Sequence, residues 1–316
     1  MKDTILFGDC KDTLKTIDSK VQMCVTSPPY YGLRDYGGEE NQIGQENTPE
    51  EYINNLVEVF REVRNILSDD GVLWVNIGDS YYNYRPGKGQ GLVKQSVSKT
   101  NQDLPTKCNR RANKLEGLKE KDLIGIPWML AFALRSDGWY LRQDIIWHKP
   151  NPMPESVKDR CTKSHEYIFL LSKNKKYYYD NEAIKEPVKQ DWGTRDRTKG
   201  KYHNSGTGLS PHTGLSKSYD RKTKRSVWSV TNKPYKDAHF AVYPPDLIEP
   251  CILAGSKEGD IILDPFMGSG TTGMVAKKLG RHYIGCELHE SYAELIDKRV
   301  PVDKPVHNAL TMALNM

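Results

Sequence analysis

The part of the chain that most constrains the fold is residues 261–279, where an apolar strand leads through a glycine-rich loop directly into a helix. The strand is predicted at residues 261–263 and the helix at residues 274–279. Strand, loop and helix in this order form the βα unit of nucleotide-binding folds, because glycines let the backbone approach a ligand closely. A second strand at residues 282–286 ends at Glu287, about 20 residues further on, where such folds place a carboxylate for ribose hydroxyls. The unit therefore predicts a site for a ligand that contains ribose.

The loop leaves two ligand classes open. Gly268, Gly270 and Gly273 match G-x-G-x-x-G, which is also found in nicotinamide-dependent dehydrogenases, whereas no Gly-Lys-Ser/Thr follows that would indicate a P-loop. Asp264 argues against a dinucleotide, because a carboxylate at the end of the strand would repel a phosphate at the helix N-terminus. The same carboxylate suits the ammonium group of an amino acid. S-adenosylmethionine combines ribose, adenine and such an ammonium group.

A second segment, Thr-Ser-Pro-Pro-Tyr at residues 26–30, follows an apolar run at residues 21–25 that is short enough to be a buried strand. Its two prolines remove backbone donors and leave carbonyl groups free to accept hydrogen bonds, and Tyr30 offers a face for stacking. With the Ser27 hydroxyl, these groups suit a flat ring that carries an exocyclic amine. A simple proline-rich turn is the alternative interpretation.

Together the two segments resemble the motifs of DNA amino-methyltransferases, which use S-adenosylmethionine to methylate N4 of cytosine or N6 of adenine. Residues 264–272 resemble the cofactor motif of that family, and residues 26–30 resemble its catalytic [Asp/Asn/Ser]-Pro-Pro-[Tyr/Phe] motif. Because the catalytic motif comes first here, the order resembles the circularly permuted beta subgroup. The resemblance implies that the catalytic residues are Ser27, Pro28, Pro29 and Tyr30.

Three further segments support the resemblance. Residues 8–10 resemble the element that lies against adenine, residues 145–154 the strand and loop before the target-recognition region, and residues 239–244 the element that closes the methionine side of the pocket. The cofactor-binding residues implied in this way are Asp9, Cys10, Thr26, Asp264, Pro265, Phe266, Gly268, Ser269, Gly270, Thr271 and Glu287.

The remaining signals predict an α/β fold with helices on both faces of a mostly parallel sheet. Helices are predicted at residues 56–67 and 123–134, and strands at residues 4–7, 72–77, 141–147 and 165–171. Asp69-Asp70-Gly71 is expected to stop the first helix before the next strand, and residues 165–171 are expected to pair antiparallel with residues 141–147. The resemblance adds a doubly wound, Rossmann-like sheet of seven strands with one antiparallel strand.

Two segments are strongly basic. Residues 185–225 hold 11 Lys or Arg against 4 Asp or Glu, and residues 85–119 hold 9 against 2, so each carries a net charge of +7 in a chain of net charge +5. A charge run is often only a solvated loop, but beside a site for a nucleobase it predicts contact with a polyanion.

The predicted domain organisation follows from these segments. Residues 1–176 and 239–316 form the catalytic domain, residues 177–238 form a target-recognition region with enough aromatic residues for a small subdomain, and residues 83–119 form a mobile basic loop. The candidate DNA-binding residues are Arg195, Arg197, Lys199, Arg221, Lys224, Arg225, Arg110 and Arg111. Arginine can contact base edges in the major groove, although Arg and Lys contact phosphates more often.

Other chemistries have weaker support. Pro250-Cys251 resembles the Pro-Cys of the C5-cytosine enzymes, but it precedes the cofactor loop and lies in an apolar helical stretch, so Cys251 is expected in the core. His148 and His239 are expected to be structural, because direct attack by an amine needs no strong base. The six cysteines lack metal-ligand spacing, and no metal site is expected.

Residue Ser27 is the clue to the target base. Serine before Pro-Pro resembles the N4-cytosine enzymes, whereas Asp or Asn is usual in the N6-adenine enzymes, so N4 of cytosine is preferred and N6 of adenine stays open. The expected partner is double-stranded DNA, and a homodimer and a cognate restriction endonuclease stay open. No apolar run reaches the roughly 18 residues of a membrane span and no signal peptide is evident, so a cytoplasmic protein of bacterial, archaeal or phage origin is expected.

Overall fold

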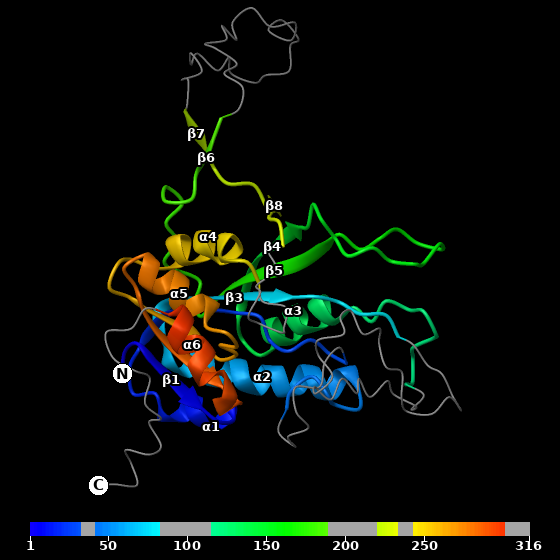
Figure 1. The fold of residues 1–316 in the computed structure, drawn as a ribbon, viewed down its shortest axis with the longest axis horizontal. Coiled ribbons are helices and arrows are strands. Elements are labelled where there is room, and N and C mark those ends of the chain that lie inside the picture. The colour runs from blue at the N-terminus through cyan, green and yellow to red at the C-terminus, as the bar shows by residue number, and fades with distance from the viewer. Residues whose placement is uncertain (33–41, 83–114, 189–219, 233–242, 301–316) are drawn as a thin grey trace, which may run out of the picture.

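The computed structural model describes residues 1–32, 42–82, 115–188, 220–232 and 243–300, which form a central sheet with helices on both faces (Figure 1). The sheet has eight strands in the order β1-β10-β9-β2-β3-β5-β4-β8. The strands are β1 Thr4–Phe7, β2 Val21–Thr26, β3 Leu67–Ile77, β4 Tyr140–His148, β5 His165–Ser172, β8 Val227–Ser229, β9 Ile261–Asp264 and β10 His282–Glu287. Only β5 runs antiparallel to its neighbours, β3 and β4. The predicted α/β class is confirmed, and β8 extends the sheet beyond the expected seven strands.

The helices bury their apolar sides against this sheet. Helix α2 begins with a capping box, in which the Thr48 hydroxyl accepts from the Glu51 N–H and the Glu51 carboxylate accepts from the Thr48 N–H. Helices α1, α2 and α3 pack on one face of the sheet, and α4, α5 and α6 pack on the other. Their bounds are α1 Cys10–Thr13, α2 Pro49–Ile66, α3 Ile126–Ser136, α4 Pro245–Gly255, α5 Thr271–Lys278 and α6 Ala293–Arg299.

The Asp69-Asp70-Gly71 run ends no helix, because α2 already stops at Ile66 and the run lies inside β3. Strand β3 pairs with β2 from Leu67 onward, and its residues 68–71 then lie opposite Gln22 alone. This part of β3 is therefore a bulge, in which Gly71 approaches β2 so closely that a Cβ atom would lie 3.0 Å from the Gln22 carbonyl oxygen. The expected helix stop therefore lies earlier, at Ile66, and the polar run belongs to the bulge of β3.

The segment predicted to recognise DNA contributes to the core of the sheet. The ring centroid of Trp74 in β3 lies 6.5 Å from that of Tyr179 and 6.4 Å from that of Trp228. Tyr177 and Trp228 also pack in the core cluster beneath α4, because β8 pairs with β4 and carries Trp228 over the sheet. These three aromatic residues therefore pack on the sheet and not in a subdomain of their own.

Two short strands extend from this region. Strands β6 Glu186–Pro187 and β7 Arg221–Lys222 pair with one another in a separate two-stranded ladder. Figure 1 shows this ladder beyond α4, away from the eight-stranded sheet. Residues 189–219, which the ladder brackets, lie outside the described residues.

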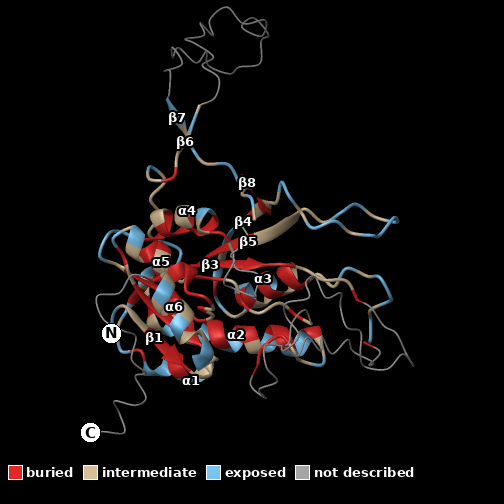
Figure 2. Ribbon diagram, in the orientation of Figure 1, coloured by how far each residue is buried: buried red, intermediate tan, exposed pale blue. Residues whose placement is uncertain are grey.

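The buried residues lie between the sheet and the helices that cover its two faces. Figure 2 shows buried residues along the strands and on the sides of the helices that face them, with exposed residues on the outside. Among the described residues, no helix combines the length and apolar character needed to cross a membrane. Within the same ranges, no group of three or more His, Cys, Asp or Glu side chains is arranged to hold a metal ion.

Candidate active site

The predicted cofactor residues lie along one edge of the sheet. Strands β1, β10, β9 and β2 are parallel neighbours, so their carboxyl ends meet at the same edge. Asp264 ends β9, Glu287 ends β10, Thr26 ends β2, and Asp9 directly follows the turn after β1. The sheet therefore brings together four segments that lie far apart in the sequence.

Asp264 links the strand ends. Its carboxylate is 1% exposed and accepts hydrogen bonds from the Thr26 hydroxyl at 2.6 Å, the Phe266 N–H at 3.0 Å, the Tyr243 hydroxyl at 2.9 Å and the Thr272 hydroxyl. Burial raises the pKa of Asp264, and these hydrogen bonds oppose the rise. Four donors match the roughly four lone-pair sites of a carboxylate. The structure therefore gives Asp264 a role in holding the loop to β2, and its contact with an ammonium group stays a prediction.

The loop between β9 and α5 needs its glycines. Gly268 has φ +53° and Gly270 has φ +82°, values in the left-handed region that other residues rarely adopt. A Cβ atom on Gly270 would also lie 2.9 Å from Cγ2 of Val300. The buried Ser269 hydroxyl bonds to the Arg299 guanidinium. The loop is thus fixed by its backbone and by contacts with α6 and its end.

Thr271 leaves a polar atom without a partner in this loop. Its hydroxyl oxygen is buried in the first turn of α5 and has no hydrogen-bond partner among the described residues. Most buried polar atoms have a partner, so this hydroxyl would be available to a ligand held by the loop. Pro265 is buried and Phe266 is half-buried beside it.

Glu287 supplies an acceptor at the end of β10. It is 9% exposed, and it accepts from the Gly268 N–H at 2.8 Å and from the His289 N–H at 3.1 Å. Burial raises the pKa of Glu287, while these two hydrogen bonds lower it. Next to it, Asp9 caps α1 and Cys10 is buried. Two lone-pair sites of Glu287 remain for hydroxyl groups of a ligand.

These residues fit a nucleoside that carries an amino-acid chain. The glycine loop permits close approach, Glu287 offers oxygens to a ribose, and the Thr271 hydroxyl lacks a partner among the residues described. S-adenosylmethionine has groups of each matching kind.

The predicted catalytic segment follows β2 beside this edge. The Pro29 carbonyl accepts from the Tyr52 hydroxyl of α2 at 2.8 Å, which fixes the backbone of the segment. Burial raises the pKa of Tyr30 well above its ordinary value, the Glu166 carboxylate raises it further, and the Ser27 side chain opposes both effects. Tyr30 is therefore a neutral phenol that can donate its proton.

Tyr30 donates into a polar network at the ends of β3 and β5. Its hydroxyl lies 2.7 Å from Oε2 of Glu166 and 3.3 Å from Oδ1 of Asn76. Glu166 also forms an ion pair with Lys149, whose ammonium group lies 4.3 Å from the ring centroid of Trp147. The Lys149 and Glu166 side chains are only 17% and 15% exposed, so this pair is poorly accessible to water.

Gly78 seats the ring of Tyr30. A Cβ atom on Gly78 would lie 2.6 Å from Cε2 of Tyr30, which is closer than such contacts allow. We expect Gly78→Ala to displace the ring and to lower kcat for methyl transfer by about 10-fold or more, since misplacement by about 1 Å costs up to about 100-fold. Single-turnover rates measure this effect. In a Tyr30→Ala background, Gly78→Ala should cause no further loss of the methyl-transfer rate. A further loss there would contradict the explanation.

Glu166 and Asn76 were not predicted as site residues from the sequence. Asn76 interrupts the buried apolar run of β3, and Glu166 lies at the start of β5, just before its own apolar run. A polar residue inside or beside a buried apolar run was the signal in the sequence that could have identified these site residues. A polar residue in a buried strand needs a partner, but the partner itself cannot be read from the sequence.

Three of the predicted DNA-binding residues lie among the described residues. Arg221 donates to the Lys185 carbonyl at 2.7 Å, Arg225 donates to Glu186 at 2.6 Å, and the Lys224 ammonium group lies 4.9 Å from the ring centroid of Trp228. They lie in or just after the β6–β7 ladder, and their role in binding DNA stays a prediction. The other five predicted residues, Arg195, Arg197, Lys199, Arg110 and Arg111, lie outside the described residues.

Two of the three side chains weighed for other chemistries have structural contacts, and the third, His239, lies outside the described residues. Cys251 is buried in α4, where its thiol donates to the Leu247 carbonyl, and burial raises its pKa. His148 lies at the end of β4, with Nδ1 3.0 Å from the Ser229 hydroxyl of β8. The expected structural roles agree with these positions.

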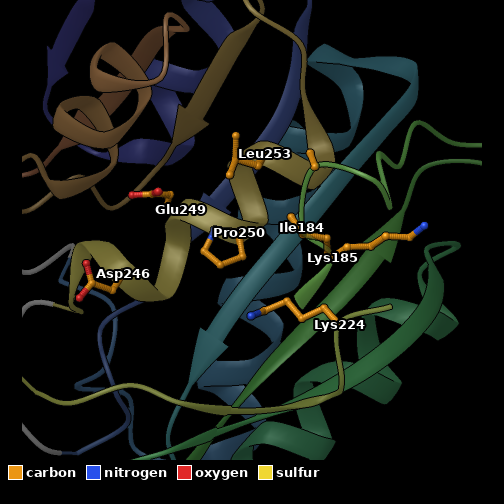
Figure 3. Close-up of a pocket in the computed structure, with 8 residues that line it drawn as sticks. Ile184, Lys185, Lys224, Asp246, Glu249, Pro250 and Leu253 are labelled. Atoms are coloured by element: carbon orange, nitrogen blue, oxygen red, sulfur yellow. The ribbon is translucent and has the colours of Figure 1, made fainter. Parts of the chain in front are cut away.

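A hollow of about 340 Å³ lies elsewhere, between α4 and the chain around residues 183–185 (Figure 3). Its lining mixes Lys185 and Lys224 with Asp246 and Glu249, and the labelled side chains come from these two segments and, for Lys224, from the chain after β7. It contains none of the motif residues. It is therefore separate from the site at the sheet edge.

Known DNA methyltransferases are similar to this chain over most of its length. Residues 21–298 match the family model N6_N4_Mtase, described as DNA methylase. The chain is 48% identical over 302 residues to the Type II methyltransferase M.SmaI of Serratia marcescens, covering 94% of this chain and 90% of that protein. It is 46% identical over 299 residues to the Type II methyltransferase M.Cfr9I of Citrobacter freundii, covering 94% and 87%.

Solved structures share the fold. The cytosine-N4-specific PvuII DNA methyltransferase superposes with a TM-score of 0.62 at 17% identity, covering 96% of this chain and 88% of that one. A putative DNA modification methylase from Thermus thermophilus, complexed with S-adenosyl-L-methionine, superposes with a TM-score of 0.57 at 22% identity, covering 94% and 92%. The family match and the close relatives confirm the predicted resemblance, and the chain belongs to the N6/N4 family of DNA methylases.

Proposed function

We propose that this protein transfers a methyl group from S-adenosylmethionine to N4 of cytosine in DNA. It is an S-adenosylmethionine-dependent DNA amino-methyltransferase, which removes the nicotinamide-dependent dehydrogenase from consideration. The observation that carries the choice of cytosine is Ser27, a hydroxyl where the N6-adenine enzymes usually have Asp or Asn. The cytosine-N4-specific PvuII enzyme, whose fold is shared, supports the same choice.

The residues at the sheet edge would hold the cofactor. Glu287 would accept from ribose hydroxyls, Asp9 and Cys10 would lie against the adenine, and residues 268–271 would surround the remaining groups. When bound, S-adenosylmethionine supplies a methyl group that is electrophilic because its sulfur is positively charged. Asp264 and Thr26 would hold the loop in register with the catalytic segment, through the 2.6 Å hydrogen bond between them.

The catalytic segment would make the amine reactive. The lone pair of an exocyclic amine is delocalised into the ring, so the nitrogen is a poor nucleophile. Hydrogen bonds from the amine to the Ser27 hydroxyl and the Pro28 carbonyl would favour a pyramidal nitrogen as positive charge develops on it. Tyr30 would hold the ring by stacking. These fixed dipoles would stabilise the transition state without a strong base. As the new N–C bond forms, the methyl–sulfur bond would break, S-adenosylhomocysteine would leave, and the methylated nitrogen would lose one proton to water.

The base must leave the double helix to reach this segment. Flipping costs a few kcal/mol, which contacts to the flipped base and to the DNA backbone must offset. We assign target recognition to residues 177–238 and a grip on the backbone to the basic residues 83–119. Arg221, Lys224 and Arg225 would contribute from the β6–β7 ladder, and Arg195, Arg197, Lys199, Arg110 and Arg111 from the rest of these segments. The proposal also includes a homodimer as the assembly of this protein and a cognate restriction endonuclease as its partner.

Mass spectrometry of nucleosides tests the target base. DNA incubated with the protein and S-adenosylmethionine is expected to yield N4-methylcytosine, because Ser27 precedes Pro28-Pro29. N6-methyladenine without N4-methylcytosine would overturn the choice of cytosine and establish the alternative, the N6-adenine enzyme. Sequencing of the modified sites then gives the recognition sequence.

A further inference from the structure

Lys163 brings a positive charge to the neighbourhood of the catalytic segment. Its ammonium group donates to the Asp79 carbonyl at 3.1 Å. Asp79 directly follows Gly78, and a Cβ atom on Gly78 would lie 2.6 Å from Cε2 of the Tyr30 ring. Along the chain, Lys163 comes shortly before Glu166, which accepts from the Tyr30 hydroxyl at 2.7 Å. Two independent contacts therefore place Lys163 near the ring of Tyr30.

The charge of Lys163 is not balanced by a carboxylate. The Lys163 side chain is half-buried, yet no ion pair among the described residues includes it. By contrast, Lys149, Lys173 and Lys277 are also half-buried, and each of them pairs with a carboxylate. An ammonium group has three N–H donors, so two donors of Lys163 remain for an acceptor outside the described residues after the bond to Asp79.

Two carboxylates act on Lys163 from a distance, and both are engaged by other groups. The Asp79 carboxylate accepts from two backbone N–H groups at the start of α3, at 3.0 and 3.1 Å. The Glu166 carboxylate accepts from Tyr30 and pairs with Lys149. Burial lowers the pKa of Lys163, and the two carboxylates oppose this effect. An anion at the ammonium group would offset the cost of burying its charge.

A DNA phosphate is the anion that suits this position. A base that flips out of the double helix rotates about the backbone to which it stays attached. A base stacked on Tyr30 therefore brings the phosphates of its own nucleotide toward the rim that Lys163 and Asp79 form. Lysine binds phosphate as a point charge and needs no defined angle of approach.

We propose that the ammonium group of Lys163 binds a phosphate of the nucleotide whose base is flipped onto Tyr30. The contact holds the extruded nucleotide by its backbone, while Tyr30 holds the base by its face. It thereby offsets part of the cost of flipping. The inference rests on the proposed methylation of DNA and names one backbone contact within it. It applies equally to cytosine and adenine, because both bases are attached to the same sugar-phosphate backbone.

Lys163→Gln and a DNA with one neutral linkage test the contact together. The DNA is a duplex that carries the methylated sequence, with a methylphosphonate in place of the phosphate on the 5′ or the 3′ side of the target nucleotide. For the wild-type protein, one of these two linkages is expected to raise the Kd for DNA about 10-fold, because it removes a charge-assisted hydrogen bond.

Lys163→Gln is expected to raise the Kd for the unmodified duplex by a similar factor. The neutral linkage should then cause no further loss in this variant, because the contact is already absent. The Kd of S-adenosylmethionine and the melting temperature should be unchanged. The proposal is overturned if neither linkage weakens binding by the wild-type protein, or if both linkages weaken binding by Lys163→Gln as much as they weaken it in the wild-type protein.

The salt dependence of DNA binding is a second measurement. Each phosphate contact contributes about −0.7 to −0.9 to the slope of log K against log salt concentration, where K is the association constant for DNA. Lys163→Gln is expected to make this slope shallower by about that amount. Lys163→Arg keeps the charge and should restore both the slope and the sensitivity to the neutral linkage. A wild-type slope in Lys163→Gln would contradict the contact.

Lys20→Gln is the matched control. Lys20 also donates to a backbone carbonyl, that of Asn65 at 2.9 Å, but it precedes β2 and so lies at the opposite edge of the sheet. This variant is expected to keep the wild-type Kd for DNA and the wild-type sensitivity to the neutral linkage. Absence of methyl transfer by the wild-type protein would overturn the proposed function itself. Normal transfer, with independent effects of Lys163→Gln and the linkage, would overturn only the phosphate contact.

Discussion

A Ser27→Ala variant is expected to lose about 10²- to 10³-fold in the rate of methyl transfer and to bind S-adenosylmethionine as tightly as the wild-type protein. The change removes the acceptor that the amine would use. The residues assigned to the cofactor, such as Glu287 and the loop before α5, have no described contact with the Ser27 side chain. In this variant the rate of methyl transfer should therefore fall while the affinity for S-adenosylmethionine stays unchanged.

Transfer of a labelled methyl group to DNA measures the rate, and calorimetric titration measures the Kd of the cofactor. Tyr30→Ala is a companion variant, which removes the stacking face and should lose transfer to a similar extent. Ser19→Ala is a suitable control, because Ser19 lies before the opposite end of β2 and makes exposed hydrogen bonds only. Wild-type rates in both Ser27→Ala and Tyr30→Ala would disprove the mechanism.

Asp264→Ala is expected to weaken cofactor binding by at least about 100-fold and to lower the free energy of unfolding by about 3 kcal/mol or more. The carboxylate satisfies four donors in a buried position, which include the hydroxyls of Thr26 and Tyr243. Removing it leaves these donors unpaired, at a cost of about 1–3 kcal/mol for each group that stays buried. It also releases the glycine loop from β2, so the pocket would lose its shape.

Denaturant unfolding and calorimetric titration measure the two effects of Asp264→Ala. Asp264→Asn separates charge from shape, because the amide keeps the volume but brings two donors into a site that needs only acceptors. Asp264→Asn should therefore also bind the cofactor weakly. Asp260→Ala serves as the control, because the Asp260 side chain only accepts from the exposed Lys257 N–H. Normal cofactor binding by Asp264→Ala would contradict the role assigned to this carboxylate.

The parts of the fold that sequence predicts well are those with local signals. The strand before Asp264 and the strand that ends at Glu287 have the predicted bounds within a residue, because apolar runs and glycines mark them. The motif residues at the ends of these strands meet at one edge because parallel strands share their direction. Both the cofactor edge and the catalytic segment could be predicted in this way.

The contacts that complete the site depend on distant parts of the chain. Tyr30 and Glu166 are 136 positions apart, and their hydrogen bond exists only because β5 lies beside β3. The bulge in β3 is likewise visible only in the register with β2, where Val21 lies opposite Leu67 and Met23 lies opposite Val72. Neither contact leaves a periodic pattern in the sequence, so both require the folded sheet.

The hydrogen bond between Thr26 and Asp264 joins residues that are 238 positions apart. This separation determines when the pocket can form during synthesis. During synthesis β2 leaves the ribosome long before β9, which must dock beside it to complete the parallel edge. Strand β1 also waits, because its partner in the sheet is β10. A nascent chain therefore has no complete pocket and cannot modify DNA until both late strands have emerged, so activity begins only after the whole sheet has been made.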